Sequence, residues 1–202
     1  MQTDAQKWEE RYRSGDFPGD NEPAAFLWEV FPFLPRGRAL DLAMGAGRSA
    51  VFLAANGWQV TGIDRARTAL EKATALAGER GVHVHWARAL PPKSSPRSTG
   101  LLLLEADLEN CLLPISQFEV IVCFYYLQRS LFAAIQRALR PGGILVYETY
   151  TLEQLAFHKG PHNPEHLLRP HELRDAFESL QTLFYRELRA GKGIASLLAR
   201  KP

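Results

Sequence analysis

Apolar residues along the chain fall into short continuous runs separated by stretches of helical spacing. The clearest run is FEVIVCFYY at 118–126, in which Glu119 is the one charged interruption. Continuous apolar runs of this length are typical of strands that are buried on both faces of a sheet. Shorter runs at 38–44, 59–64 and 144–150 predict three further strands.

The stretches between these runs have the spacing of amphipathic helices. The pattern predicts helices over 24–30, which Pro32 ends, over the residues between Gly47 and Gly57, and over 68–78. Leu131, Ile135 and Leu139 mark another helix, which ends at the sequence Pro-Gly-Gly. A last helix is predicted by the spacing of the apolar residues after Pro170, which are Leu173, Phe177 and Leu180.

The third strand has two candidate segments, 82–86 and 101–104. Either segment alone could be the strand, or the two could pair as a hairpin, and the pattern does not decide between these alternatives. The segment 88–100 between them is rich in proline, serine and glycine. We expect it to be a flexible loop inserted into the domain.

Strands that alternate with helices predict an α/β fold with a Rossmann-like, doubly wound and mostly parallel sheet. Near the end of the chain, extended segments at 183–188 and 194–200 flank the turn AGKG and predict a C-terminal antiparallel hairpin. We expect residues 1–202 to form a single domain whose first 35 residues are a cap segment. Ligands of such sheets bind beyond the carboxyl ends of the strands, where the strand order reverses.

Charge and composition add limits to this picture. Lys and Arg number 24 and Asp and Glu number 22, giving a net charge of +2, and the basic residues are scattered, so we expect no nucleic-acid partner. The two cysteines suit a reducing compartment, and no apolar run approaches the roughly 20 residues of a membrane helix. The first ten residues lack the apolar core of a signal peptide. A cytoplasmic protein without membrane partners is expected, with an oligomeric state that the sequence does not indicate.

Polar chemistry is concentrated after the first two predicted strands. Gly45 and Gly47 permit backbone geometry and close approach that a Cβ atom would block, and the following helix presents free amide groups to a ligand. Asp64 ends the second strand, where its carboxylate can accept hydrogen bonds from a ribose diol. The set predicts an adenosine-containing cofactor. GAGRSA at 45–50 also fits a dinucleotide pattern, so a nicotinamide-dependent oxidoreductase is the alternative.

RALDLAMGAGRSAVFLAANGWQVTGID at 38–64 resembles the first two motifs of class I S-adenosylmethionine-dependent methyltransferases. LRPGGILVYET at 139–149 is similar to the turn and strand that follow the fourth helix of that family. WEERY at 8–12 and PHNPEHLLRPHEL at 161–173 resemble the branch that contains tellurite-resistance and other small-molecule methyltransferases. The resemblance implies transfer of a methyl group from S-adenosylmethionine to a small-molecule acceptor by direct displacement.

The resemblance also implies a set of cofactor-binding residues. These are Asp41, Ala43, Gly45 and Gly47 for the methionine and ribose, Asp64 for the ribose hydroxyls, Arg65, Asp107 and Leu108 for the adenine, Cys123 and Phe124 where the acceptor pocket begins, and Trp8 and Tyr12 in a segment that folds over the cofactor. Ala43 and Met44 replace a glycine and a cysteine of the family motif. That departure leaves a non-catalytic S-adenosylmethionine-binding module as a further alternative.

The reaction requires no universal base because the sulfonium already activates the methyl group. If the acceptor must lose a proton, the candidates are Tyr126, Glu148 and His162, which follow the predicted strands or lie in the acceptor-side loop at 151–170. The acceptor loops carry no signature that excludes a nucleic acid or protein acceptor. Four of the six histidines fall within 158–171, but the prolines there break any helix that would align them, so no metal site is expected.

Overall fold

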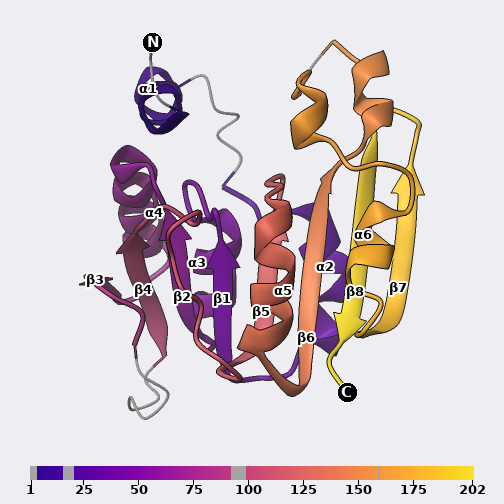
Figure 1. The fold of residues 1–202 in the computed structure, drawn as a ribbon. Coiled ribbons are helices and arrows are strands. Elements are labelled where there is room, and N and C mark those ends of the chain that lie inside the picture. The colour runs from indigo at the N-terminus through magenta and orange to yellow at the C-terminus, as the bar shows by residue number, and fades with distance from the viewer. Residues whose placement is uncertain (1–3, 16–20, 92–98, 159) are drawn as a thin grey trace.

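The computed structural model describes residues 4–15, 21–91, 99–158 and 160–202, and these residues form an eight-stranded sheet with helices on both faces (Figure 1). The sheet order is β3-β4-β2-β1-β5-β6-β8-β7. The strands are β1 (Arg38–Leu42), β2 (Gln59–Asp64), β3 (Val84–Ala87), β4 (Gly100–Glu105), β5 (Phe118–Phe124), β6 (Leu139–Tyr150), β7 (Gln181–Leu188) and β8 (Ile194–Arg200).

Strands β1 to β6 pair in parallel, whereas β8 is antiparallel to both β6 and β7. The predicted Rossmann-like sheet with a C-terminal hairpin is therefore confirmed. None of the helices in the described ranges is long and apolar enough to cross a membrane.

Alternate residues of each central strand enter separate cores on the two faces of the sheet. Val120 and Val122 of β5 pack with α2 (Ala25–Val30), α3 (Arg48–Ala55) and α4 (Arg67–Glu79). Ile121 and Cys123 pack with α5 (Phe132–Ala138) and α6 (Glu172–Ala176), which lie in front of the sheet in Figure 1. Burial on both faces explains why β5 reads as a continuous apolar run.

Both candidate segments for the third strand are strands. β4 pairs with β2, and β3 pairs in parallel with β4 at the edge of the sheet, which rules out the alternative in which these two segments form a hairpin. The edge position leaves β3 half-exposed, which explains its weaker apolar pattern. Residues 92–98 of the predicted flexible loop lie outside the described residues.

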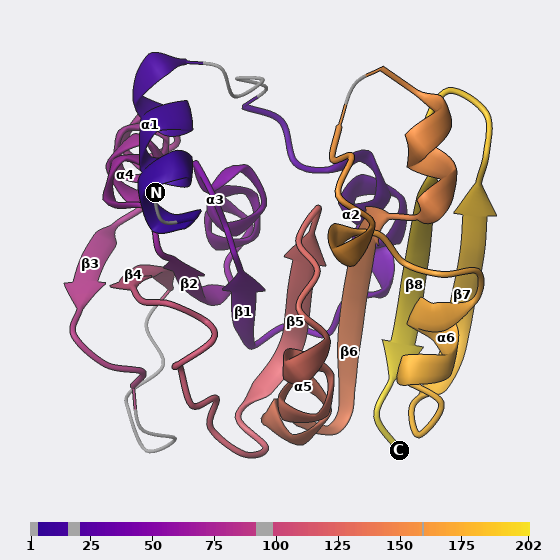
Figure 2. The ribbon, with the colours of Figure 1, turned by 45° about the horizontal axis from the view of Figure 1, so that its top comes forward.

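The structure differs from the sequence-based expectation at α1, β6 and α6. The cap segment contains a helix, α1 (Asp4–Ser14), which lies across α4 in Figure 2. β6 begins at Leu139 rather than at Ile144, and α6 ends at Ala176, before Phe177 and Leu180 of the predicted spacing. Short 3-10 turns join the other elements: η1 (Phe31–Phe33), η2 (Arg129–Leu131), η3 (Leu152–Ala156) and η4 (Pro164–His166).

The strand order reverses at β1, which pairs with β2 on one side and with β5 on the other. The chain therefore leaves the carboxyl ends of β1 and β5 toward opposite faces of the sheet. In parallel sheets this arrangement opens a crevice that binds ligands.

Candidate functional site

The turn after β1 has a left-handed backbone at three of its residues. The φ angles are 54° at Ala43, 56° at Gly45 and 81° at Gly47. A Cβ atom on Gly47 would lie 2.6 Å from the Ala73 Cβ, and one on Gly45 would overlap the hydroxyl of Tyr12. Glycine is required at both positions, by backbone angle and by space. Ala43 adopts the same unfavourable angle with a side chain.

Asp64 at the end of β2 fastens this turn. Its Oδ2 accepts a hydrogen bond from Gly45 N at 2.8 Å, and its Oδ1 accepts one from Ala66 N at 2.9 Å. Burial raises the pKa of Asp64, and these backbone N–H groups oppose the shift. Each carboxylate oxygen has a second lone pair, so the residue keeps acceptor capacity for a ligand hydroxyl.

Asp41 at the end of β1 is 2% exposed, and its Oδ2 has no hydrogen-bond partner within the described part of the chain. Burial, together with the charge of Asp64, raises the pKa of Asp41 to about 8, against the opposing charge of Arg48. A buried carboxylate oxygen without a donor carries a desolvation cost that a cationic ligand group would relieve.

Met44 turns away from the ligand side of the turn into the core. It is 6% exposed and packs with the helices on the α3 face. Its sulfur and terminal methyl fill the space beside Gly62 of β2. The bulky residue in the motif therefore does not fill the crevice.

Arg65 and Asp107 meet beyond the carboxyl ends of β2 and β4. The guanidinium Nη2 of Arg65 lies 3.1 Å from Asp107 Oδ2, and both side chains are about one-third exposed or less. Leu108 beside them is buried. The three residues predicted at the adenine edge are thus brought together by the fold.

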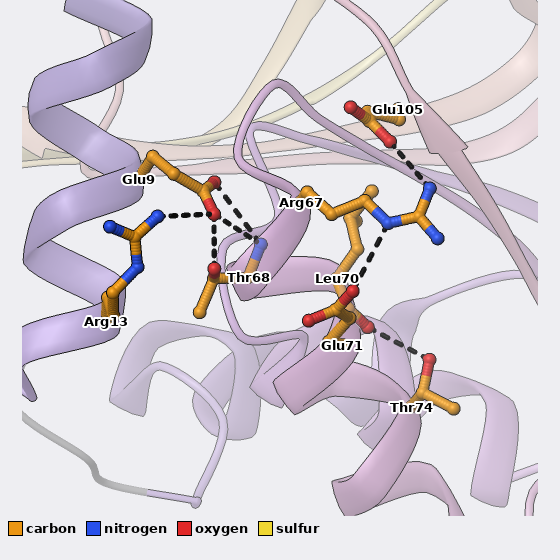
Figure 3. A network of polar contacts seen from close by, with 8 residues as sticks. All are labelled: Glu9, Arg13, Arg67, Thr68, Leu70, Glu71, Thr74 and Glu105. Atoms are coloured by element: carbon orange, nitrogen blue, oxygen red, sulfur yellow. Dashed lines mark hydrogen bonds and ion pairs between the residues drawn. The ribbon is translucent and has the colours of Figure 1, made fainter.

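Helix α1 closes over the turn through contacts with α4. The Glu9 carboxylate accepts hydrogen bonds from the backbone N of Thr68, at 3.3 Å, and from its hydroxyl (Figure 3). No side chain of its own caps α4, so Glu9 supplies the acceptor that the helix terminus lacks. Tyr12 is buried against the turn, while Trp8 is 36% exposed. A cavity of about 270 Å³ between α1 and α4 includes Ala46 but neither Asp41 nor Asp64.

On the other side of the crevice, Glu148 of β6 holds Tyr125. The Tyr125 hydroxyl donates to Glu148 Oε1 at 3.0 Å, and the Ser196 hydroxyl donates to Oε2 at 2.6 Å. Glu148 is 1% exposed, with Arg186 as its nearest cation at 3.9 Å. Tyr125 has a left-handed φ of 57°, and such strained residues concentrate at functional sites.

The other candidate bases lie elsewhere. The Tyr126 hydroxyl donates to Gln128 Oε1 at 2.5 Å, and its side chain packs with the core on the α5 face. His162 is exposed in the loop before η4. Among the described residues, no group of three or more histidines, cysteines or acidic residues is placed to hold a metal ion.

Two further predicted residues sit at the end of β5. Cys123 is fully buried, with its thiol 3.8 Å from the Tyr126 carbonyl oxygen, so its side chain contributes to the core rather than to a pocket wall. Phe124 is partly buried against the α3 face. Arg48, Ser196 and Lys192 have no predicted role, because only the folded chain brings Ser196 to Glu148 and the two cations to Tyr125.

Comparison with known proteins identifies the motif-bearing region. The sequence matches a family model described as a methyltransferase domain over residues 40–147, more than half of the 202 residues. It is 26% identical over 157 residues to the ubiquinone biosynthesis O-methyltransferase of Pasteurella multocida, covering 67% of this chain and 61% of that protein. It is 28% identical over 146 residues to ribosomal RNA small subunit methyltransferase B of Thermus thermophilus, covering 66% of this chain and 36% of that protein. The chain thus matches less than two thirds of either relative's length.

Solved structures with the same fold include several described as S-adenosylmethionine-dependent methyltransferases. TehB from Haemophilus influenzae superposes with a TM-score of 0.69 at 15% identity, covering 98% of this chain and 68% of that one.

Proposed function

The chain belongs to the methyltransferase-domain family of S-adenosylmethionine-dependent enzymes, and on that premise we propose that its acceptor is a small molecule methylated by direct displacement. The family match favours this function over the nicotinamide-dependent oxidoreductase that the glycine pattern also allowed. The observation that carries the proposal is the arrangement of Asp41, Gly45 and Asp64 around one left-handed turn at the point where the strand order reverses.

The residues present fit the cofactor. We assign the partnerless Oδ2 of Asp41 to the cationic methionine end, because a positive charge there would relieve the buried carboxylate. Asp64 would accept hydrogen bonds from the ribose hydroxyls. Arg65, Asp107 and Leu108 would lie at the adenine edge. Trp8 and Tyr12 on α1 would cover the bound molecule. When bound, the cofactor supplies a methyl group that its sulfonium has already activated.

The chain's own residues then have to orient the acceptor and exclude water. Of the three candidate bases, Glu148 is the one that holds a phenol at the end of β5, and we propose that it acts through Tyr125. A proton leaving the acceptor would pass to the Tyr125 oxygen as the Tyr125 proton moves to Glu148. Burial and the charge of Glu148 raise the pKa of Tyr125, which keeps the phenol protonated until an acceptor arrives.

A small acceptor suits the elements around the crevice. The acceptor side is bounded by α1 and by the loop at 151–170, which Arg129 fastens to the end of β5. The Arg129 guanidinium donates to the carbonyl oxygens of Glu165 and Leu167 and pairs with Glu172. The short length of these segments supports a small acceptor, although one relative is named for ribosomal RNA. Both cysteines are free thiols, which supports a cytoplasmic location.

The proposal is tested with S-adenosylmethionine labelled in its methyl group and a cell extract separated into small-molecule, RNA and protein fractions. We expect label from the cofactor to enter the small-molecule fraction only when the folded chain is present. The Glu148→Gln variant should transfer much more slowly, whereas Tyr126→Phe should transfer at the wild-type rate. Label in RNA or protein alone would contradict a small acceptor, and cofactor binding without any transfer would support the non-catalytic alternative.

A further inference from the structure

Two cationic side chains from distant segments lie close to one aromatic ring on the acceptor side. The guanidinium carbon of Arg48 is 5.5 Å from the ring centroid of Tyr125, and Nζ of Lys192 is 5.9 Å from the same centroid. The Tyr150 ring lies beside it, with 5.3 Å between the two ring centroids. We call these four residues the Tyr125 cluster.

Neither cation of the Tyr125 cluster has a carboxylate partner within the described ranges. Most arginines whose side chains the structure places form ion pairs, as Arg65 does with Asp107 and Arg186 with Glu29. Arg48 and Lys192 take part in no ion pair or side-chain hydrogen bond there, and both are only partly exposed. A partly buried cation without a counterion is desolvated at a cost that an anionic ligand would offset.

The nearby carboxylates form no ion pair with Arg48 or Lys192 within the described ranges. Glu148 uses one oxygen for Tyr125 and the other for Ser196, with Arg186 as its nearest cation. Asp41 lies close enough to Arg48 for their charges to interact, but the proposed function assigns the Asp41 carboxylate to the cationic end of the cofactor. Arg48 and Lys192 are therefore available to an anionic group beside Tyr125.

The fold fixes the backbone positions from which both cations extend. Arg48 is the first residue of α3, directly after the left-handed Gly47. Lys192 lies in the turn between β7 and β8, next to Gly193, whose N donates to Gln154 Oε1 at 3.0 Å and whose carbonyl oxygen accepts from Thr151 N at 3.0 Å. A fixed backbone lowers the ordering cost of binding an anion.

We propose that the acceptor carries a carboxylate or phosphate group beside a flat ring, with Arg48 and Lys192 binding the anion and the rings of Tyr125 and Tyr150 packing against the ring. The two tyrosines are half-buried, as pocket walls would be. This inference rests on the proposed function, because the Tyr125 cluster selects a substrate only if the turn at Gly45 holds the cofactor.

The test titrates small probes into the folded chain saturated with S-adenosylhomocysteine and follows them by ligand-observed NMR. The probes are benzoate, phenyl phosphate, neutral phenol and cationic benzylamine, with a short single-stranded RNA as a further arm. We expect at least one of the two anions to bind about tenfold more tightly than phenol or benzylamine, the gain of one charge-assisted contact. Benzoate against phenyl phosphate distinguishes a carboxylate from a phosphate.

The anion preference should fall about tenfold in Arg48→Gln and in Lys192→Gln. It should persist in Arg80→Gln, where the arginine follows α4 at the opposite edge of the sheet and pairs with Glu22. Lys192 lies in a turn, so its variant keeps the test valid if the Arg48 variant fails to fold. Equal binding of all four small probes, a preference that survives in the Lys192 variant, or RNA binding tighter than either anion overturns the inference. Failure to bind S-adenosylhomocysteine overturns the proposed function as well.

Discussion

The sulfur of Met44 occupies the space beside Gly62 that a Cβ atom would fill. Such an atom would overlap the sulfur and lie 3.0 Å from the terminal methyl carbon of Met44. Gly62 lies in the middle of β2, where glycine has no side chain to pack and weakens a strand. The glycine therefore accommodates the methionine, and the unusual residue of the motif is compensated on the neighbouring strand.

Gly62→Ala should destabilise the fold. Because the new methyl group meets buried sulfur, we expect the free energy of unfolding to fall by about 1–3 kcal/mol, as for other overpacked cores. Urea denaturation followed by circular dichroism measures the change.

The matched control is Gly78→Ala in α4, where a Cβ atom meets nothing within 4 Å, and the free energy of unfolding of this variant should rise by roughly 0.5–1 kcal/mol. Combining Gly62→Ala with Met44→Ala should cost less than the separate effects added together. Full additivity would contradict the contact.

Ala43→Gly should cost no stability, unlike the usual replacement of alanine by glycine. A left-handed backbone costs a residue with a Cβ atom roughly 1–2 kcal/mol, and glycine at φ 54° avoids that cost. Ala75→Gly on the exposed side of α4 is the control, and it should lose about 1 kcal/mol. Thermal denaturation of the two variants compares them. Equal losses at both positions would show that Ala43 is not strained.

Asp41→Asn should change how stability depends on pH. With its pKa raised to about 8, Asp41 holds its proton in the folded chain from roughly pH 4 to pH 8, where the unfolded chain has released it. The contribution of this residue to stability is therefore present at low pH and is lost as pH rises through that window. The wild type should lose stability relative to the asparagine variant between about pH 5 and pH 8. Parallel pH profiles of the two proteins would contradict an Asp41 that is protonated in the folded chain.

Glu9→Ala should loosen α1 from α4. The variant removes the acceptor at the start of α4, which we expect to cost about 1 kcal/mol and to speed dissociation of S-adenosylhomocysteine. Hydrogen exchange at the Thr68 amide reports the opening. Hydrogen bonds from Thr68 lower the pKa of Glu9, so the contact is complete above the ordinary glutamate pKa and weakens as pH falls through the lowered value. The control is Glu10→Ala, because the Glu10 carboxylate pairs with Arg13 on the exposed side of α1. This variant should leave the dissociation rate of S-adenosylhomocysteine and the hydrogen exchange at Thr68 unchanged.

Local patterns predicted those parts of the fold that depend on neighbours in sequence. The apolar run that begins at Phe118 predicted a strand buried on two faces, and the glycines at 45 and 47 predicted a turn that needs left-handed backbone angles. The sequence did not decide how the segments at β3 and β4 form strands, because strand pairing and direction depend on long-range contacts.

Helix α1 was missed because its apolar pattern is weak. Tyr12 is the one residue of α1 with a described side chain that is buried, too few for an apolar stripe.

In the candidate site too, the sequence predicted the residues of local motifs but not those that only the fold brings together. Asp64 and Gly45 are recognisable because Asp64 ends β2 and Gly45 lies in the turn after β1, and their hydrogen bond joins two adjacent motifs. The Tyr125 cluster was not recognisable, since Arg48 and Lys192 are far apart in sequence and approach Tyr125 only because β1, β5, β6 and β8 are neighbours in the sheet. Alternation along β5 turns the Cys123 side chain into the core.

Isothermal titration calorimetry with S-adenosylhomocysteine tests the central claim, that the turn between β1 and α3 binds the methyltransferase cofactor. We predict saturable binding at one site per chain, weakened about tenfold or more in an Asp64→Asn variant that melts as the wild type does. A reduced nicotinamide cofactor, followed by its fluorescence, should not bind. Absence of heat at millimolar S-adenosylhomocysteine, or equal affinity in the Asp64 variant, would contradict the account.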